Sequence, residues 1–177
     1  MLRKVISGGQ TGADQGGLYA AKLCGLETGG AIPKGFLTEN GAMPELKELF
    51  NLEEHSSAQY PPRTLLNVAE SDGTVRIAVN FSTAGEKCTL RACKDLQKPY
   101  FDIKVVSEDV SIFFREDNIE KTKVMQKYKD VINECTKWIQ ENNIKILNVA
   151  GNRESTSPGL CQFVSSFLTQ VFLFEKQ

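Results

Sequence analysis

The sequence lacks several features that would point to common functional classes. It contains a single histidine, His55, in an irregular stretch where a surface position is expected, so a zinc site has too few ligands. A Ser-His-Asp triad would have to use that same histidine, and no G-x-S-x-G elbow supports one. No apolar run is long enough to span a bilayer. Zinc enzymes, serine hydrolases and membrane-spanning proteins are therefore disfavoured.

An excess of one charge is also missing. The chain has 21 Lys+Arg and 22 Asp+Glu, with no basic or acidic tail, so neither nucleic acid nor a membrane is expected as a partner. Its five cysteines are odd in number, and no pair has the C-x-x-C spacing of a metal or redox site. Without a secretory signal, these observations predict free, mostly buried thiols and a cytoplasmic location.

Strand-like and helix-like segments alternate along the chain. Strands are predicted at residues 4–7, 28–32, 74–79, 100–103 and 145–149. Helices are predicted at 14–24 and 86–96, as one long helix at 119–141, and as a final helix that Ser157 and Pro158 begin as N-cap and first residue. This alternation predicts a single α/β domain over residues 1–177, with a Rossmann-like three-layer α/β/α architecture and a mostly parallel sheet.

Two segments fit this alternation less well. Residues 37–66 have a loop-like composition, with Pro44, Pro61 and Pro62, and a loop of that length is usually functional or a lid. Residues 110–114 are apolar enough for an edge strand. The apolar face of the final helix, from Leu160 to Phe172, indicates core or a subunit interface.

Three polar, glycine-containing loops follow predicted strands and precede predicted helices. They span residues 8–14, 82–89 and 150–157. Ligands of open parallel sheets bind beyond the carboxyl ends of the strands, where helix N-termini offer unpaired N–H groups to a phosphate. Each loop alone is weak evidence, because Gly8 and Gly9 could form a simple tight turn and match neither a G-x-G-x-x-G nor a Walker A motif. Together the three loops predict a phosphate site.

Several charged residues have two interpretations. Asp14 either compensates the dipole of its helix or contacts a ligand. Lys34 is either a solvated loop lysine or an anion anchor, and Arg63 could reach the site from the long loop. Arg153 either clamps a phosphate in bidentate fashion or forms a plain salt bridge.

At these loops the sequence resembles a known family. The segments are ISGGQTGADQGGLYAAKLCGLETGGAIPKGFLTENG (residues 6–41), YPPRTLLNVAESDGT (60–74), the small-residue loop before Thr89, KPYFDI (98–103) and LNVAGNRESTSPGL (147–160). In this order they resemble the molybdenum cofactor carrier proteins of the circularly permuted YpsA-type branch of the SLOG superfamily. The resemblance implies a Rossmann-like fold related to the lysine-decarboxylase-like proteins, a homo-oligomer (dimer or tetramer), and molybdenum cofactor (molybdopterin) or a nucleotide-like molecule as the ligand.

One position departs from the family pattern. Where the family has Thr-Gly-Gly-Thr, this chain has Thr83-Ala84-Gly85-Glu86. Glu86 could hydrogen-bond a ribose or pterin edge or cap its own helix. The catalytic glutamate of related phosphoribohydrolases is also missing, because the comparable stretch begins at Thr89 and reads TLRA. Their hydrolytic chemistry is therefore not expected.

Three hypotheses remain open. The first is non-catalytic binding of a phosphate-bearing small molecule, with carriage or storage of molybdenum cofactor preferred. The second is a sensor or phage-type sponge for a cyclic or NAD-derived nucleotide signal, and the third is a nucleotide N-glycosidase or phosphoesterase. No metal ligand or catalytic residue is assigned, and the expected ligand-binding residues are Gly8, Gly9, Gln10, Thr11, Gly12, Asp14, Lys34, Arg63, Ser82, Thr83, Gly85, Glu86, Gly151, Asn152, Arg153, Glu154 and Ser155.

Overall fold

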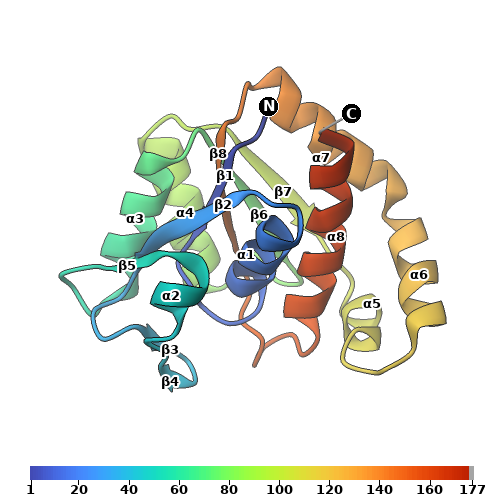
Figure 1. The fold of residues 1–177 in the computed structure, drawn as a ribbon, viewed down its shortest axis with the longest axis horizontal. Coiled ribbons are helices and arrows are strands. Elements are labelled where there is room, and N and C mark those ends of the chain that lie inside the picture. Colours follow the sequence, from blue (N-terminus) through green and yellow to red (C-terminus); the bar gives the residue numbers. More distant parts are fainter. Residues whose placement is uncertain (176–177) are drawn as a thin grey trace.

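The fold is built on a six-stranded sheet in which every neighbouring pair is parallel. The computed structural model describes residues 1–175 (Figure 1). The strand order is β5-β2-β1-β8-β6-β7. These strands are β1 (Lys4–Ser7), β2 (Glu27–Ile32), β5 (Leu52–Glu54), β6 (Gly73–Ala78), β7 (Tyr100–Lys104) and β8 (Ile146–Gly151). The predicted parallel α/β architecture is confirmed.

Helices cover both faces of the sheet. On one face α1 (Ala13–Leu23), α7 (Lys129–Glu141) and α8 (Leu160–Glu175) pack together, and on the other α3 (Tyr60–Glu70) packs against α4 (Ala84–Asp95) (Figure 1). Shorter helices α2 (Leu46–Phe50), α5 (Ser107–Ile112) and α6 (Asn118–Lys127) and a hairpin of β3 (Leu37–Thr38) and β4 (Gly41–Ala42) complete the order. In the part of the chain described, no helix has both the length and the apolar character needed to cross a membrane.

The largest core cluster lies between the sheet and α8. Strand residues such as Val75 and Val149 pack there against Phe163 and Phe167, which are fully buried. Tyr128 meets the Phe163 ring edge to face at 5.1 Å. The aromatic side of the final helix is thus core, and burying such rings supplies much of a domain's apolar stabilisation.

The opposite face of the sheet carries far more polar side chains. Thr74, Arg76 and Asn148 are buried there under α3 and α4, and the apolar cluster between those helices is small. A polar interior of this kind needs internal partners, because an unpaired buried polar group costs on the order of 1–3 kcal/mol.

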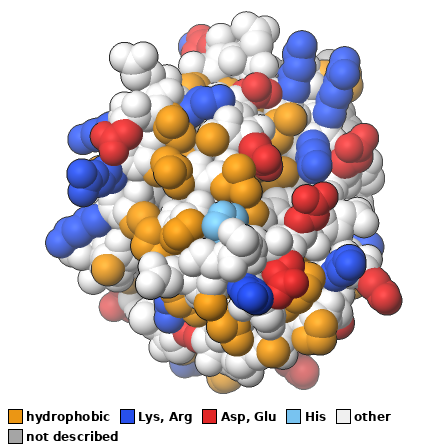
Figure 2. All heavy atoms as spheres, turned by 90° about the vertical axis from the view of Figure 1, so that its left-hand side faces the viewer, with side chains coloured by type: hydrophobic (Ala, Val, Ile, Leu, Met, Phe, Trp, Pro, Cys, Tyr) orange, Lys and Arg blue, Asp and Glu red, His pale blue; other side chains and the backbone are white. Residues whose placement is uncertain are grey.

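The prediction that residues 37–66 form a loop was wrong. The segment holds β3, β4, α2, the edge strand β5 and the first turns of α3. Elements of two to five residues are too short to produce a periodic pattern. Pro61 and Pro62, interpreted as loop signals, occupy the first turn of α3, where proline fits because that N–H has no helical acceptor. His55 lies next to this edge, half-buried and visible at the surface in Figure 2.

Two other element predictions were also wrong. Residues 110–114 belong largely to helix α5, because Val110 and Phe113, three apart, are the side chains that become buried. The single helix at 119–141 is two helices separated at Tyr128, whose backbone leaves the helical range (φ −92°, ψ 6°). The Tyr128 hydroxyl accepts a hydrogen bond from the Val106 N–H at 3.0 Å, which holds this break against the core.

The predicted N-cap of the final helix was wrong as well. Helix α8 begins at Leu160, not at Ser157, and Gly159 before it has φ +96°. The carboxylate of Glu154 accepts hydrogen bonds from the N–H groups of Gly159 (2.6 Å) and Cys161 (2.8 Å). A carboxylate at this end also complements the helix dipole.

Candidate functional site

A cavity of about 270 Å³ opens at the carboxyl edge of the sheet, between the first turns of α3 and α4. A second cavity of about 270 Å³ adjoins it, sharing Ala84, Gly85, Gly151 and Arg153. The strands meet here at the point where chain connections leave for opposite faces, which is the usual ligand position in such sheets. The first cavity is lined by Gln10, Asp14, Tyr60, Pro61, Arg63, Thr64, Ala84, Gly85, Glu86, Cys88, Thr89, Ala150, Gly151 and Arg153.

Two arginines from different elements converge on one aromatic ring in this cavity. The guanidinium carbon of Arg153, from the loop after β8, lies 4.9 Å from the centre of the Tyr60 ring, and that of Arg63, from α3, lies 5.8 Å from it. Arg63 has one acidic partner, Asp14, at 3.5 Å. Among the ion pairs of residues 1–175, none involves Arg153. The pair of cations is therefore only partly neutralised.

The close approach of Arg63 explains one glycine. A Cβ atom on Gly8 would lie 1.6 Å from Nη1 of Arg63, so a side chain at that position would displace the guanidinium. The glycine loop thus contributes to the site by leaving room for Arg63.

The N-terminus of α4 offers unused hydrogen-bond donors to the same cavity. Thr83 caps the helix, its hydroxyl accepting from the Glu86 N–H at 3.3 Å. Ala84 and Gly85 begin the helix, so their N–H groups have no acceptor within it, and none is found elsewhere in the described residues. A Cβ on Gly85 would meet no atom within 4 Å. Open space next to two free N–H groups suits an anion.

Asp14 lines the cavity next to Arg63. It lies in the first turn of α1, and its carboxylate accepts a hydrogen bond from the Gln10 N–H at 3.2 Å. Burial raises the pKa of Asp14, while the Arg63 guanidinium opposes that shift. The Asp14 carboxyl and the Arg63 guanidinium thus form an ion pair in the cavity wall that is largely shielded from solvent.

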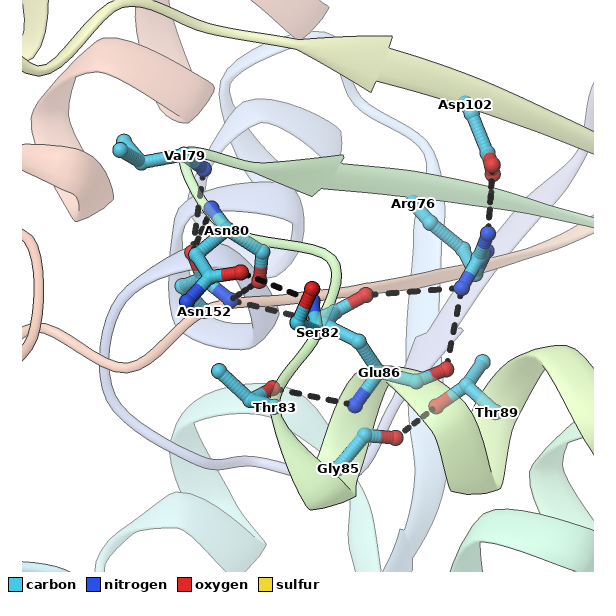
Figure 3. A network of polar contacts seen from close by, with 10 residues as sticks. All are labelled: Arg76, Val79, Asn80, Ser82, Thr83, Gly85, Glu86, Thr89, Asp102 and Asn152. Carbon is cyan, nitrogen blue, oxygen red and sulfur yellow. Dashed lines mark hydrogen bonds and ion pairs between the residues drawn. The ribbon is translucent and has the colours of Figure 1, made fainter.

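Behind the cavity lies a charge network around the buried side chains of Arg76 and Glu86, which the sequence did not reveal (Figure 3). Arg76 of β6 is 1% exposed, and its Nε donates to Asp102 Oδ1 at 2.8 Å while its Nη2 contacts Asp102 Oδ2 at 2.5 Å. Its Nη1 donates to the Glu86 carbonyl at 3.0 Å and lies 3.7 Å from Glu86 Oε2. Phe81 and Tyr100 place their rings 4.9 and 5.5 Å from the guanidinium carbon.

Glu86 of this network has an unusual protonation equilibrium. Burial raises the pKa of Glu86 to about 7, against the opposing charge of Arg76 and with additional repulsion from Asp14 and Asp102. Thr83, not Glu86, caps the helix, so the capping role predicted for Glu86 was wrong. The Glu86 side chain instead joins the cavity wall to the buried network.

Three buried polar atoms of the cavity-lining residues have no hydrogen-bond partner in the described part of the chain. They are Nε2 of Gln10, Nε of Arg63 and Oε2 of Glu86. Buried polar atoms are nearly always paired in folded proteins, so unpaired ones deserve an explanation. Their concentration around one cavity is typical of a site built for a polar ligand.

Comparison with known proteins agrees with this geometry. Residues 5–172 match the circularly permutated YpsA SLOG family. The chain belongs to that family. A solved structure from Syntrophus aciditrophicus, named "Putative molybdenum carrier protein", is 32% identical, with a TM-score of 0.77 over 97% of this chain and 95% of that one. No curated protein matches the chain.

The strand order of this SLOG protein makes the circular permutation visible. When the chain is followed as a circle that starts at β6, the sheet order β7-β6-β8-β1-β2-β5 corresponds to 2-1-3-4-5-6. That is the order of flavodoxin-like doubly wound sheets, extended by one strand. The last helix, α8, then takes the place of an ordinary crossover helix between the neighbouring strands β8 and β1.

Asn152, predicted for the ligand, also stabilises the loops of this SLOG protein. The side-chain oxygen of Asn152 accepts from the N–H groups of Val79 (3.0 Å) and Asn80 (2.9 Å), and its amide nitrogen donates to the Asn80 carbonyl at 3.0 Å (Figure 3). Asn152 thereby ties the loop after β8 to the loop after β6. Lys34 is exposed and lies outside the cavity lining.

The structure thus divides the predicted residues into two groups. Those in the lining of the two adjoining cavities are Gln10, Asp14, Arg63, Thr83, Gly85, Glu86, Gly151, Asn152 and Arg153. Those outside that lining are Gly8, Gly9, Thr11, Gly12, Lys34, Ser82, Glu154 and Ser155. Tyr60 and Thr64 of α3 also line the cavity but were not predicted, although the prolines at positions 61 and 62 fit the first turn of a helix there.

Proposed function

We propose that this protein binds a phosphate-bearing small molecule in the cavity between α3 and α4 and carries molybdenum cofactor there. The observation that carries the proposal is the convergence of Arg63 and Arg153 on Tyr60, in a cavity that Ala84 and Gly85, with their free N–H groups, also line. The family and the name of the Syntrophus aciditrophicus protein support the identity of the cargo.

The phosphate is expected at the cationic end of the cavity. Hydrogen bonds between guanidinium and phosphate are charge-assisted and roughly twice as strong as neutral ones. The partial positive charge at the N-terminus of α4 acts on the same group. This local arrangement allows anion binding by a chain whose net charge is only −1.

The remaining part of the cavity suits a heterocycle rather than a bare metal ion. No group of three His, Cys, Asp or Glu residues within residues 1–175 is arranged to hold a metal. Such a group is not required for molybdenum cofactor, since its dithiolene already holds the molybdenum. Thr83 and Glu86 line the part of the site assigned to the ring, and the Tyr60 ring offers a stacking surface beside the arginines.

A retention assay tests the proposal. The protein is incubated with molybdenum cofactor, molybdate, and cyclic and linear nucleotides including NAD derivatives, then separated from free ligand and denatured for mass spectrometry. We expect intact pterin cofactor, with retention reduced roughly tenfold or more in Arg153→Ala because a charged hydrogen bond is lost. Arg115→Ala, which removes an exposed arginine outside the two cavities, is the matched control and should retain cofactor normally.

The other products of the same assay contradict the proposal in different ways. Retention of an intact nucleotide without pterin would replace the carrier with a sensor or sponge. Recovery of a cleaved nucleotide would contradict non-catalytic binding altogether.

A further inference from the structure

The tip of the β3–β4 hairpin places a carboxylate between two of the site loops. Glu39 accepts hydrogen bonds from the hydroxyl of Thr11, in the loop after β1, and from the hydroxyl of Ser155, in the loop after β8. The Ser155 N–H donates to the same carboxylate at 3.1 Å. Two hydroxyls and one N–H, from loops at the carboxyl edge of the sheet, thus hold one anionic group.

The setting of Glu39 is electropositive although it has no direct cationic partner. Burial would raise the pKa of Glu39, but the hydrogen bonds from Ser155 and Thr11 and the charge of Arg153 outweigh it, so the pKa is lowered. Across the described residues, no Lys or Arg is paired with Glu39. The three donors therefore hold the carboxylate with support from a more distant guanidinium.

Gln10 connects this group to the ligand cavity. Its side-chain oxygen accepts from the N–H groups of Glu39 (2.9 Å) and Thr11 (3.0 Å). Its side-chain nitrogen is one of the unpartnered buried atoms, and Gln10 lines the cavity. Gln10 therefore contacts both the Glu39 group and the proposed phosphate site. The charge of Arg153 acts on both as well.

We propose that Thr11 and Ser155 form a second oxyanion subsite, for a tetrahedral oxyanion such as phosphate or molybdate, and that Glu39 occupies it as a built-in competitor. The subsite rests on the proposed function, because it extends the same ligand site. Binding of the oxyanion releases Glu39 and loosens the hairpin. A dianion is attracted to Arg153 more strongly than the single charge of Glu39 is, and this difference favours displacement of the carboxylate.

The hairpin is built so that it can be released. Its ladder pairs only Leu37 with Ala42 and Thr38 with Gly41. A two-stranded unit of this length has little stability of its own. Phe36 and Met43 at its base pack on the cluster around Phe50, so the tip can move while the base stays in place.

The decisive experiment measures binding of inorganic phosphate, and separately of molybdate, by calorimetry. Glu39→Ala is expected to bind roughly tenfold more tightly than the wild type, because a competing charged hydrogen-bond acceptor is removed. Glu39→Gln, which keeps the side-chain size, is expected to change affinity in the same direction by less. Glu45→Gln removes an exposed acid next to the hairpin and should leave affinity unchanged. The two titrations show which oxyanion the subsite prefers.

Hydrogen exchange supplies a second readout. Amides of residues 38–43 should exchange faster in the wild type when the preferred oxyanion is bound. Affinity that is unchanged or weaker in both folded Glu39 variants, or exchange that ignores the oxyanion, overturns the subsite. The cofactor assay on the wild type is independent of this result. Retention of cofactor by the wild type combined with no Glu39 effect removes only the subsite, whereas failure of the wild type to retain cofactor removes the proposed function.

Discussion

Arg76 is the residue whose chemical environment is most demanding. It is almost fully buried, pairs with Asp102 through two nitrogens, and has two aromatic rings close to its guanidinium group. Nothing in its sequence context, an apolar strand, distinguishes it from a half-exposed arginine. Asp102 comes from β7, 26 residues away, so this pairing could not have been predicted without the register of the sheet.

Replacing Arg76 should therefore be costly. In Arg76→Met the buried Glu86 carboxyl loses its neighbouring cation and the Glu86 carbonyl loses a hydrogen-bond donor, whereas the exposed Asp102 can be solvated. Leaving buried polar groups without partners typically costs about 1–3 kcal/mol of unfolding free energy. Arg91→Met removes an exposed arginine of α4, paired only with Asp95, and should stay within about 0.5 kcal/mol of the wild type. Urea denaturation of both variants checks the difference. Equal losses of unfolding free energy in the two variants would mean that the contacts of Arg76 stabilise the fold no more than an exposed ion pair does.

Glu86 should make stability fall as the pH rises. Its pKa lies at about 7 in the folded protein, above its ordinary 4.5, so the folded state binds this proton more tightly than the unfolded chain does. The stabilisation is complete below pH 4.5 and is lost as the pH rises to about 7, and it amounts to roughly 3 kcal/mol. Glu86→Gln lacks this pH-dependent loss. Its unfolding free energy minus that of the wild type should therefore be larger at pH 8 than at pH 5, by roughly 2–3 kcal/mol.

Urea denaturation at the two pH values measures this shift. Glu134→Gln, which removes an exposed acid of α7, should show no such pH-dependent difference from the wild type. A constant difference between Glu86→Gln and the wild type across this range would mean that the carboxyl is ionised in both states.

At the scale of elements, the three strand-end loops were predictable because glycine and polar residues follow short apolar runs. What each loop does was harder to predict. The backbone N–H groups of the loop after β1 are partly used by other protein groups and not left for a ligand. The Thr11 N–H donates to the Gln10 side chain, and the Ala13 N–H donates to the Asn152 carbonyl. The loop after β8 supplies a helix cap through Glu154. Such uses depend on contacts between loops that lie far apart in the chain.

The contact between these two loops depends on Gly12. Its φ is +77°, and a Cβ there would lie 2.4 Å from the Asn152 carbonyl oxygen. Gly12→Ala should therefore combine backbone strain with a steric clash and push the two loops apart. Gly25, after α1, has φ +68° but open space around a Cβ, so Gly25→Ala isolates the strain, about 1 kcal/mol.

We expect Gly12→Ala to lose at least twice as much unfolding free energy as Gly25→Ala, and to weaken ligand retention as well. Thermal unfolding of the two variants and the cofactor retention assay provide the measurements. Equal destabilisation would show that the loops can separate without cost.

At the scale of the whole molecule, the parallel sheet was predictable, because alternating strand and helix patterns leave few other arrangements. The order of its strands was not. Strand β8 is last in the chain but lies between β1 and β6, near the centre of the sheet. This position depends on the pairing of β8 with β1, from opposite ends of the chain. The same pairing brings Arg153, which follows β8, into the cavity that Gln10 and Asp14 also line.

This order predicts that the chain can be recut without changing the fold. In the view of Figure 1 the start of the chain and the end of α8 both lie at the edge opposite the site loops. A permutant that begins at Asp72 and joins residue 177 to Met1 through a Gly/Ser linker makes β8, α8 and β1 an ordinary right-handed β-α-β unit. We expect this permutant to fold with near wild-type stability and to retain ligand as the wild type does, because every site loop stays intact.

A second permutant, opened between Ser155 and Thr156, is the control. It has the same linker but cuts the loop that carries Arg153, and it should fold yet lose ligand retention. Circular dichroism, thermal unfolding and the retention assay distinguish the two. If the first permutant failed to fold, the covalent order of β8, α8 and β1 would matter more to this fold than their packing does.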